Sequence, residues 1–403
     1  MTDPGEPGVD GLLELTIGAV AHGGHFVARA PDGRVVFVRH ALPGERVRAE
    51  VTEERPGYLR ADAVEILEPA ADRVPPPCRW SGPDRCGGCD FQHVDPAVQR
   101  DLKTAVVVEQ LTRLGRMTPA EIDQLAVRVE PLSASPLGWR SRVRFTVDAA
   151  GRAGLLKHRS HEVVPVDECV IAVPGVNDAR VPASTWSDDS VEVVASSGGD
   201  IVVTARSGSA SRRVSGPDLV RETFADRTWS LDPSAFWQIH PEAPAAFVGA
   251  AIDLLDPRPG ETAWDLYGGA GLFAAELAAR VGESGHVTLV ESDQRAITAA
   301  AAALTGLPQV AFVQSTVERA GLSGRPDIVV LDPPRTGAGA RVVRMLLDAG
   351  PRAIAYVACD PAALARDVAT FRAGGWTLRA LRAFDAFPMT HHVECIALLE
   401  PSR

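Results

Sequence analysis

The sequence predicts an α/β protein in which a doubly wound parallel sheet follows two smaller β-rich parts. Strand-like runs alternate with helical segments from residue 231 onward, a βα pattern typical of a sheet with helices on both faces. A glycine-rich turn, GGAG, follows the first of these strands. Five short strand-like runs separated by glycine turns occupy residues 12–68, which is typical of a small barrel of the oligonucleotide-binding kind.

Length and composition indicate a globular protein of two or three domains, since the chain has 403 residues, of which 45% are hydrophobic. No run of eighteen apolar residues appears, and the first residues, MTDPGEPGVDG, lack the features of a signal peptide. We therefore expect a cytoplasmic protein without a membrane partner. Its six cysteines are then expected to be reduced thiols or metal ligands. The net charge of −11 argues weakly against nucleic acid as a partner, although net charge does not determine local charge.

Turn signals divide the N-terminal part of the chain. Asp32-Gly33 predicts a hairpin, Pro43-Gly44 predicts another turn, and VPPP at residues 74–77 reads as a linker. We expect three domains, with boundaries at residues 1–72, 73–230 and 231–403. The first is the β-barrel, the second a β-rich central domain and the third the doubly wound sheet.

Three cysteines, Cys78, Cys86 and Cys89, lie within twelve residues in a loop rich in Gly and Pro. Such a loop can wrap a metal centre, because thiolates bind soft metals and glycines let the backbone turn. Cys169 is the leading candidate for a fourth ligand. Four cysteines suit a structural zinc ion as well as an iron–sulfur cluster, so both remain possible from the residues alone.

A helix is predicted over residues 95–116. Asp95 can cap it, Pro96 suits its first position, and apolar residues follow at near-helical spacing. We expect this helix to pack on the central domain and to carry no chemistry.

The most basic stretch of this acidic protein is the predicted strand at residues 139–147. Alternation places Arg140, Arg142 and Arg144 on one face of it. This basic face is either a solvated surface or a contact for RNA phosphates.

The glycine turn of the third domain indicates a nucleotide-like cofactor. Gly269, Gly271 and Ala274 fit the dinucleotide fingerprint, and Glu291 ends the next strand where an acid can bind ribose hydroxyls. This pattern alone fits NAD as well as S-adenosylmethionine.

Three further features favour S-adenosylmethionine. Asp265 ends the first strand of the domain, and Asp332-Pro333-Pro334 ends the fourth. The chain then closes with two strands that we expect to pair antiparallel. Together these features predict a class I methyltransferase with a Rossmann-like sheet.

A thiol stands at a comparable strand end. The run AYVACDP ends a buried strand at Cys359, and LDPPRTG ends another at Asp332. Ligands bind at the carboxyl ends of strands in open α/β sheets, so a thiol and an acid there indicate nucleophilic chemistry. The alternative is that Cys359 is a buried small hydrophobic residue, as most free cysteines are.

At this point the sequence resembles the RNA 5-methyluridine (uracil-5) methyltransferases, and the resemblance covers nearly the whole chain. The N-terminal strands at residues 12–68, with the glycine turns between them, resemble a TRAM domain, which is an RNA-binding barrel. The loop CGGCDFQH resembles the TRAM-bearing, iron–sulfur branch of the family, the 23S rRNA uracil-5 methyltransferase type. The matching segments are FWQIH, DLYGGAGLF, LDPPRTGAG, YVACDPAALARD and DAFPMTHHVECIALL.

The resemblance implies a complete set of site residues. Cys359 would add to carbon 6 of uracil, and Glu394 would remove the proton from carbon 5. S-adenosylmethionine would be bound by Gln238, Tyr267, Glu291 and Asp332. A [4Fe–4S] cluster would be held by Cys78, Cys86, Cys89 and Cys169.

The resemblance also implies an RNA partner, ribosomal RNA in preference to transfer RNA, and a monomer. Seven residues separate Cys78 from Cys86, which is longer than the five that we expect for the family. The competing interpretations are a transfer RNA methyltransferase, a non-catalytic iron–sulfur protein that binds RNA, and an NAD-dependent dehydrogenase.

Overall fold

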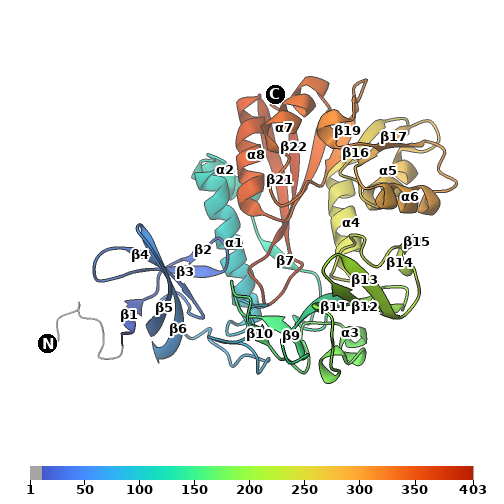
Figure 1. The fold of residues 1–403 in the computed structure, drawn as a ribbon. Helices are drawn as coiled ribbons and strands as arrows, with labels where there is room; N and C mark the ends of the chain where they lie inside the picture. Colours follow the sequence, from blue (N-terminus) through green and yellow to red (C-terminus); the bar gives the residue numbers. More distant parts are fainter. Residues whose placement is uncertain (1–10, 403) are drawn as a thin grey trace.

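The computed structural model describes residues 11–402, whose strands form four sheets. Figure 1 shows a small N-terminal sheet, a central β-rich part and a C-terminal α/β part, with helix α1 between the first and the last. Within the described range, no helix combines the length and the apolar character needed to cross a membrane.

The N-terminal sheet has six strands, one more than expected, because two residues before the Gly23-Gly24 turn form a short strand of their own. The predicted hairpin at Asp32-Gly33 is confirmed, and Gly33 has a φ of 86°, which favours glycine. The sheet order is β1-β5-β6-β4-β3-β2. Its strands are β1 (Leu13–Thr16), β2 (Val20–Ala21), β3 (His25–Arg29), β4 (Val35–Arg39), β5 (Arg46–Arg55) and β6 (Tyr58–Glu68).

The central sheet has the order β10-β9-β8-β11-β12-β13. A separate hairpin, β14–β15, leads from it to the C-terminal part. The elements are β8 (Arg142–Val147), β9 (Ala153–Leu156), β10 (Val163–Val164), α3 (Pro174–Asp178), η1 (Val181–Ala183), β11 (Ser190–Ala195), β12 (Ile201–Ser207), β13 (Ala210–Ser215), β14 (Val220–Phe224) and β15 (Arg227–Leu231).

Two arginines of the basic strand β8 have partners within the protein. The half-buried guanidinium of Arg142 donates to the carbonyl oxygen of Ala235 at 2.9 Å. Arg144 lies 3.3 Å from the carboxylate of Glu192 on the neighbouring strand. These contacts use two of the three predicted arginines, so this face offers less to an RNA phosphate than its sequence indicates.

The C-terminal sheet has the order β18-β17-β16-β19-β20-β22-β21-β7, the doubly wound arrangement that was predicted. The expected antiparallel pair at the end of the chain is confirmed as β21 and β22. The strands are β7 (Val129–Pro131), β16 (Thr262–Leu266), β17 (His286–Glu291), β18 (Val310–Gln314), β19 (Ile328–Leu331), β20 (Ala353–Ala358), β21 (Trp376–Asp385) and β22 (Glu394–Pro401). The helices are α4 (Ala243–Leu255), α5 (Leu272–Val281), α6 (Gln294–Ala303), η2 (Val317–Arg319), α7 (Gly339–Ala349) and α8 (Pro361–Ala373).

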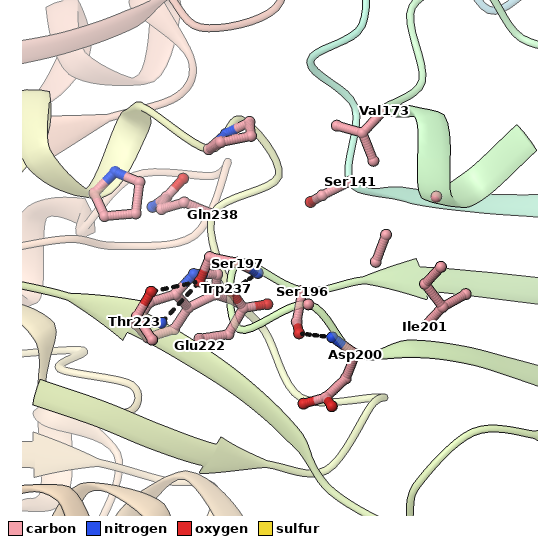
Figure 2. Close-up of a pocket in the computed structure, with 15 residues that line it drawn as sticks. Ser141, Val173, Ser196, Ser197, Asp200, Ile201, Glu222, Thr223, Trp237 and Gln238 are labelled. Atoms are coloured by element: carbon pink, nitrogen blue, oxygen red, sulfur yellow. Dashed lines mark hydrogen bonds between the residues drawn. The ribbon is translucent and has the colours of Figure 1, made fainter. Parts of the chain in front are cut away.

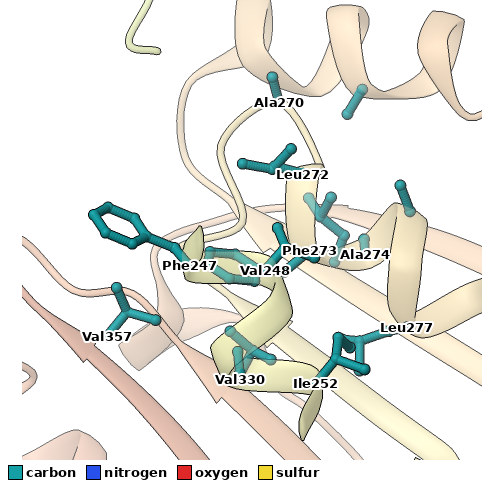
Figure 3. Close-up of a cluster of buried hydrophobic side chains, with 14 of the residues drawn as sticks. Phe247, Val248, Ile252, Ala270, Leu272, Phe273, Ala274, Leu277, Val330 and Val357 are labelled. Carbon is teal, nitrogen blue, oxygen red and sulfur yellow. The ribbon is translucent and has the colours of Figure 1, made fainter. Parts of the chain in front are cut away.

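Hydrophobic side chains pack on both faces of this sheet. On one face, Phe247 and Ile252 of α4 meet α5 and the strand residues Val330 and Val357 (Figure 3). On the other face, α7 and α8 cover a second buried cluster. The carboxyl ends of the strands are thereby held at one edge.

The prediction for helix α1 (Pro96–Arg113) is correct in its cap and wrong in its packing. The side chain of Asp95 accepts from the backbone N–H of Ala97 at 2.8 Å. However, the helix contacts α8, β7 and β2 rather than the central sheet, and α2 (Pro119–Leu125) follows it. Leu102 joins the N-terminal core while Leu111 joins the C-terminal core, because the helix is apolar on two sides. Helix α1 therefore joins the N-terminal and C-terminal parts, and β7 adds a strand to the C-terminal sheet.

The loop at residues 386–393, here called the junction loop, is held by residues from several parts of the chain. Lys103 of α1 lies 2.6 Å from the carboxylate of Asp385 and donates to the carbonyl oxygen of Phe387 at 3.1 Å. The backbone N–H of Met389 donates to the side chain of Gln99 at 2.9 Å. Both charged groups of the Lys103–Asp385 pair are buried, with side-chain exposures of 1% and 5%.

We expect Lys103→Met to lower the free energy of unfolding by about 3–5 kcal/mol, because it leaves the buried Asp385 carboxylate without a partner. The double variant Lys103→Met/Asp385→Leu is expected to recover most of that loss, since a buried ion pair can be replaced by apolar groups. Urea denaturation of the three proteins measures both effects. Equal stabilities for the single and the double variant would contradict the assignment.

Candidate active site

The register of the C-terminal sheet places Cys359 next to Glu394. Ala358 of β20 pairs with Cys395 of β22 in antiparallel register. The next positions along the two strands are Cys359 and Glu394, whose side chains point to one face because successive side chains alternate. Cys395 points to the opposite face and is fully buried, as expected of a core residue.

The pKa values of Cys359 and Glu394 are shifted by their surroundings. Burial, followed by the Glu394 carboxylate, raises the pKa of the Cys359 thiol to about 12. Burial, followed by Asp332, raises the pKa of Glu394 to about 8. The guanidinium of Arg335 opposes both increases. At neutral pH the free protein therefore holds a protonated thiol beside a mostly protonated carboxyl group.

Asp332 stands at the end of β19, beside the same groups. Its backbone N–H donates to the carbonyl oxygen of Leu266 at 3.2 Å. Burial raises its pKa to about 7, and its charge raises the pKa of Cys359, Glu394 and Asp265. The structure thus brings together Cys359, Glu394 and Asp332, which the sequence analysis singled out. Arg335 follows Asp332 by three residues and had been assigned no role, although its position in LDPPRTG is the signal for it.

The loop that carries Asp332 is fixed against the helix that follows Cys359. Tyr356 donates its hydroxyl to Asp367 of α8 at 2.7 Å, and the backbone N–H of Ala338 donates to the same carboxylate oxygen at 2.8 Å. Gly337 has a φ of 86°, and a Cβ there would lie 2.7 Å from that oxygen. A glycine is therefore needed for this close approach.

The glycine turn after β16 is held by the carboxylate of Glu291. The backbone N–H of Gly269 donates to Glu291 Oε2 at 3.1 Å, while Glu291 Oε1 accepts from Ser292 and Asp293. Tyr267 begins the turn with a φ of 61°, which is uncommon for a residue other than glycine. Glu291 therefore positions the turn, and its oxygens retain lone pairs for a ligand hydroxyl.

Asp265 lies beneath this turn and is completely buried. Its Oδ2 accepts from the backbone N–H of Ala274 at 2.9 Å, whereas its Oδ1 has no hydrogen-bond partner. Burial, with Asp332 and Glu291 nearby, raises its pKa to about 7. A buried acceptor without a partner indicates a place where a ligand donor completes the site.

Gln238, the remaining predicted cofactor-binding residue, faces a different space. It lines a cavity of about 250 Å³ together with residues of the central sheet and the β14–β15 hairpin (Figure 2). None of Tyr267, Glu291 and Asp332 lines this cavity. The structure therefore groups three of the four candidates near the strand ends, and the role of Gln238 stays a prediction.

The four predicted metal-binding cysteines surround one small cavity. Cys78, Cys86, Cys89 and Cys169 all line it, beside Trp80 and Gln92. Burial raises the pKa of Cys86 to about 11 and also raises that of Cys89 and Cys169. However, among residues 11–402 no three His, Cys, Asp or Glu side chains are arranged to hold a metal ion. The structure nevertheless brings the four cysteines to one place.

The N-terminal sheet reaches the edge of the active site. His22, in the β2–β3 turn, lies 3.1 Å from Asp360, the residue after Cys359. Asp360 also caps α8 by accepting from the backbone N–H of Ala363 at 2.7 Å. In the junction loop, His391 Nδ1 lies 2.6 Å from the carboxylate of Asp90. Asp360 is not among the predicted site residues, although Asp-Pro before a helix is a signal for a cap.

Two family comparisons match separate parts of the chain. Residues 12–64 match the TRAM domain, and residues 325–402 match the tRNA (Uracil-5-)-methyltransferase family. The second match includes Asp332, Cys359 and Glu394.

Comparisons with whole proteins extend over nearly the full length. A protein of Streptomyces avermitilis named an uncharacterized RNA methyltransferase is 47% identical, covering 96% of this chain and 98% of its own. The 23S rRNA (uracil(1939)-C(5))-methyltransferase RlmD of Thiobacillus denitrificans is 33% identical, covering 94% of this chain and 97% of its own. The crystal structure of the Pyrococcus abyssi tRNA (uracil-54, C5)-methyltransferase with S-adenosyl-L-homocysteine aligns with a TM-score of 0.72, at 20% identity, over 95% of this chain and 99% of that chain. This last likeness shows that the fold is shared.

We expect Glu394→Gln to raise the free energy of unfolding at pH 8.5 by about 2–4 kcal/mol and to have little effect at pH 5. The folded carboxyl group keeps its proton up to about pH 8, whereas the ordinary value is 4.5. Stability of the parent protein therefore falls as pH rises through this window, and glutamine removes that loss.

Urea denaturation at the two pH values measures the difference, with the exposed Glu283→Gln as the matched control. An equal gain at both pH values would show that the carboxyl group of Glu394 is not held protonated by the fold.

Proposed function

The chain belongs to the RNA (uracil-5-)-methyltransferase family and is a methyltransferase, and we propose that it forms 5-methyluridine in 23S rRNA with S-adenosylmethionine as methyl donor. The placement of Cys359 opposite Glu394 at the sheet edge carries this proposal. Ribosomal RNA is favoured because relatives named for 23S rRNA are 33% identical over 94% and 96% of the chain. Transfer RNA is the second candidate, because the C-terminal part matches a family named for it.

The residues at the strand ends fit S-adenosylmethionine. The unpartnered buried oxygen of Asp265 and the nearby Asp332 carboxyl group suit a ligand that carries positive charge and N–H donors. The oxygens of Glu291 have lone pairs for ribose hydroxyls, and Tyr267 begins the same glycine turn. When bound, S-adenosylmethionine supplies a methyl group on a positively charged sulfur. We also propose that Gln238 binds this cofactor, on the basis of the sequence resemblance, although it lines a separate cavity.

The uracil ring is activated by Cys359. Carbon 5 of uracil is a poor nucleophile, but a thiolate that bonds to carbon 6 moves electron density to carbon 5. Arg335 favours ionisation of the thiol against the opposing effect of burial, and the proton released passes to solvent. Carbon 5 then forms its bond to the methyl carbon of bound S-adenosylmethionine, while the sulfur keeps the electron pair of the broken methyl–sulfur bond and leaves as S-adenosylhomocysteine.

Glu394 completes the reaction as general base. In its ionised form it accepts the proton from carbon 5, and the electrons of the broken C–H bond restore the ring double bond and expel the Cys359 thiolate. Its pKa of about 8 in the free protein is suited to a group that must accept a proton and release it again.

The target base has to leave its stack to reach Cys359. Phe236, which directly precedes Trp237 and Gln238, has an exposed side chain at 71% relative exposure. An exposed aromatic ring beside a catalytic domain offers a surface on which a displaced base can stack.

A 23S rRNA fragment that carries 5-fluorouridine is expected to form a stable covalent adduct with the protein in the presence of S-adenosylmethionine, because fluorine cannot leave as a proton. Cys359→Ala should form no adduct, while the neighbouring Cys395→Ala should still form it. Denaturing gels measure the adduct, and peptide mass spectrometry locates it.

Glu394→Gln should accumulate a methylated adduct even with ordinary uridine. A fluorinated transfer RNA tested in parallel decides the substrate class, since an adduct with transfer RNA alone would replace ribosomal RNA as the substrate. An adduct that survives in Cys359→Ala would refute the assigned nucleophile.

We further propose that Cys78, Cys86, Cys89 and Cys169 hold a [4Fe–4S] cluster. Four thiols around one cavity are a donor set for soft metals. The sequence resemblance favours the cluster, because the loop CGGCDFQH is similar to that of the iron–sulfur branch of the family. A structural zinc ion bound by the same four cysteines is the competing occupant. In this position the cluster would fasten the cysteine loop to the central domain.

After anaerobic purification the protein is expected to be brown, with absorbance near ~400 nm and bound iron and sulfide. Cys86→Ser should lose most of the iron, whereas Cys395→Ser should keep it. Metal analysis by mass spectrometry provides the measurement, and a colourless protein with one equivalent of zinc would overturn the cluster.

A further inference from the structure

Another cavity, of about 360 Å³, opens between the N-terminal sheet and the central part. Strands β3 to β6 form most of its wall, and the loop after β9 adds His158 and Arg159. We call it the junction pocket. It shares no residue with the active site described above.

Positive groups predominate in the junction pocket. Its charged lining residues are three arginines and two acids: Arg39, Arg60, Arg159, Glu53 and Asp62. Two imidazoles, His25 and His158, line it as well. Arg39 is partly occupied, since it lies 3.4 Å from Asp90.

The two imidazoles are neutral hydrogen-bonding groups. Burial, followed by the Arg60 charge, lowers the pKa of His25 to about 3, and burial, followed by Arg39, lowers that of His158 to about 4. His158 Nε2 is buried and has no hydrogen-bond partner. This nitrogen is an unpaired polar atom within the wall of the pocket.

Arg60 is held in place by aromatic rings. Its guanidinium lies 5.4 Å from the ring centre of Tyr58 and 5.8 Å from that of Phe37, both within cation–π range. Its Nη1 is 3.2 Å from His25 Nε2. A guanidinium fixed in this way loses little conformational entropy when an anion binds.

A carboxylate of the protein already lies between two of these arginines. Glu53 is 3.0 Å from Arg60 and 3.8 Å from Arg159, and it also pairs with Arg55 at 2.6 Å. Arg60 Nε remains without a well-directed hydrogen bond despite this contact. Arg60 and Arg159 thus share one carboxylate, so the space between them suits an oxyanion.

We propose that the junction pocket binds a backbone phosphate of the substrate RNA, with Arg60 and Arg159 as its ligands. This inference rests on the proposed function, because the RNA is the one whose uridine is methylated. A phosphate matches paired guanidiniums, and RNA presents one at every nucleotide. The His22–Asp360 contact and the Arg39–Asp90–His391 contacts fix this part of the protein relative to Cys359. A phosphate bound here holds the RNA at a set distance from the reacting base.

The test compares RNA affinity across a range of salt concentrations by fluorescence anisotropy, with a labelled 23S rRNA fragment. Arg60→Gln/Arg159→Gln is expected to bind about tenfold more weakly, and its slope of log affinity against log salt should be smaller in magnitude by about 0.7–0.9, the loss of one phosphate contact. Glu53→Gln should bind more tightly than the parent, because it removes the competing carboxylate. Methylation by the double variant should show a raised KM with kcat retained.

Arg258→Gln is the matched control. It removes an exposed guanidinium just before β16, at the amino end of the parallel strands and opposite the active-site edge. It should leave the affinity and the slope unchanged. Should the double variant fail to fold, as judged by thermal unfolding, the exposed Arg159→Gln decides alone.

The outcomes separate the two proposals. A parent protein that methylates the fragment, with a double variant of unchanged affinity and slope, overturns the phosphate site and leaves the proposed function intact. A parent that neither binds nor methylates the fragment overturns the proposed function. If inorganic phosphate stabilises the parent but not the double variant, while RNA affinity is equal in both, the site serves free phosphate rather than RNA.

Discussion

The junction loop is the feature on which the arrangement of the whole molecule depends. It lies directly before Glu394, and the buried Lys103–Asp385 pair fastens it to helix α1. A buried ion pair has a strict geometry, because each charge needs the other to offset its loss of hydration. The position of the Glu394 carboxyl group, opposite Cys359, therefore depends on a helix from a distant part of the chain. Lys103 and Asp385 are 282 residues apart in the sequence.

A second constraint is the concentration of acidic groups at the sheet edge. Asp265, Asp332 and Glu394 all have raised pKa values because they are buried together. Such an arrangement is unfavourable in the free protein at high pH, since like charges in a site of low polarity repel one another. A cationic ligand relieves this repulsion. The edge is therefore better suited to the ligand-bound state than to the free state, as expected of a binding site.

In the proposed function, the parts outside the C-terminal sheet would hold the RNA in a fixed relation to the thiol of Cys359. Net charge does not indicate this task, because the chain is acidic overall, with a charge of −11. The local distribution does: Arg60 and Arg159, from two different parts of the chain, meet at one pocket. The arginines of strand β8, which look equally suitable in the sequence, are instead engaged by Ala235 and Glu192.

The sequence by itself determined the succession of strands and helices, the glycine turn after β16 and the residues that end each strand. These features follow from local rules, since backbone turns and side-chain alternation depend on neighbours a few positions away. Because parallel strands end at one edge, it also predicted that Cys359 and Asp332 would meet. Only the tertiary structure decided that α1 covers two cores, that Glu291 fastens the glycine turn and that Gln238 faces the central sheet. Those outcomes depend on contacts between distant segments, whose partners no local pattern specifies.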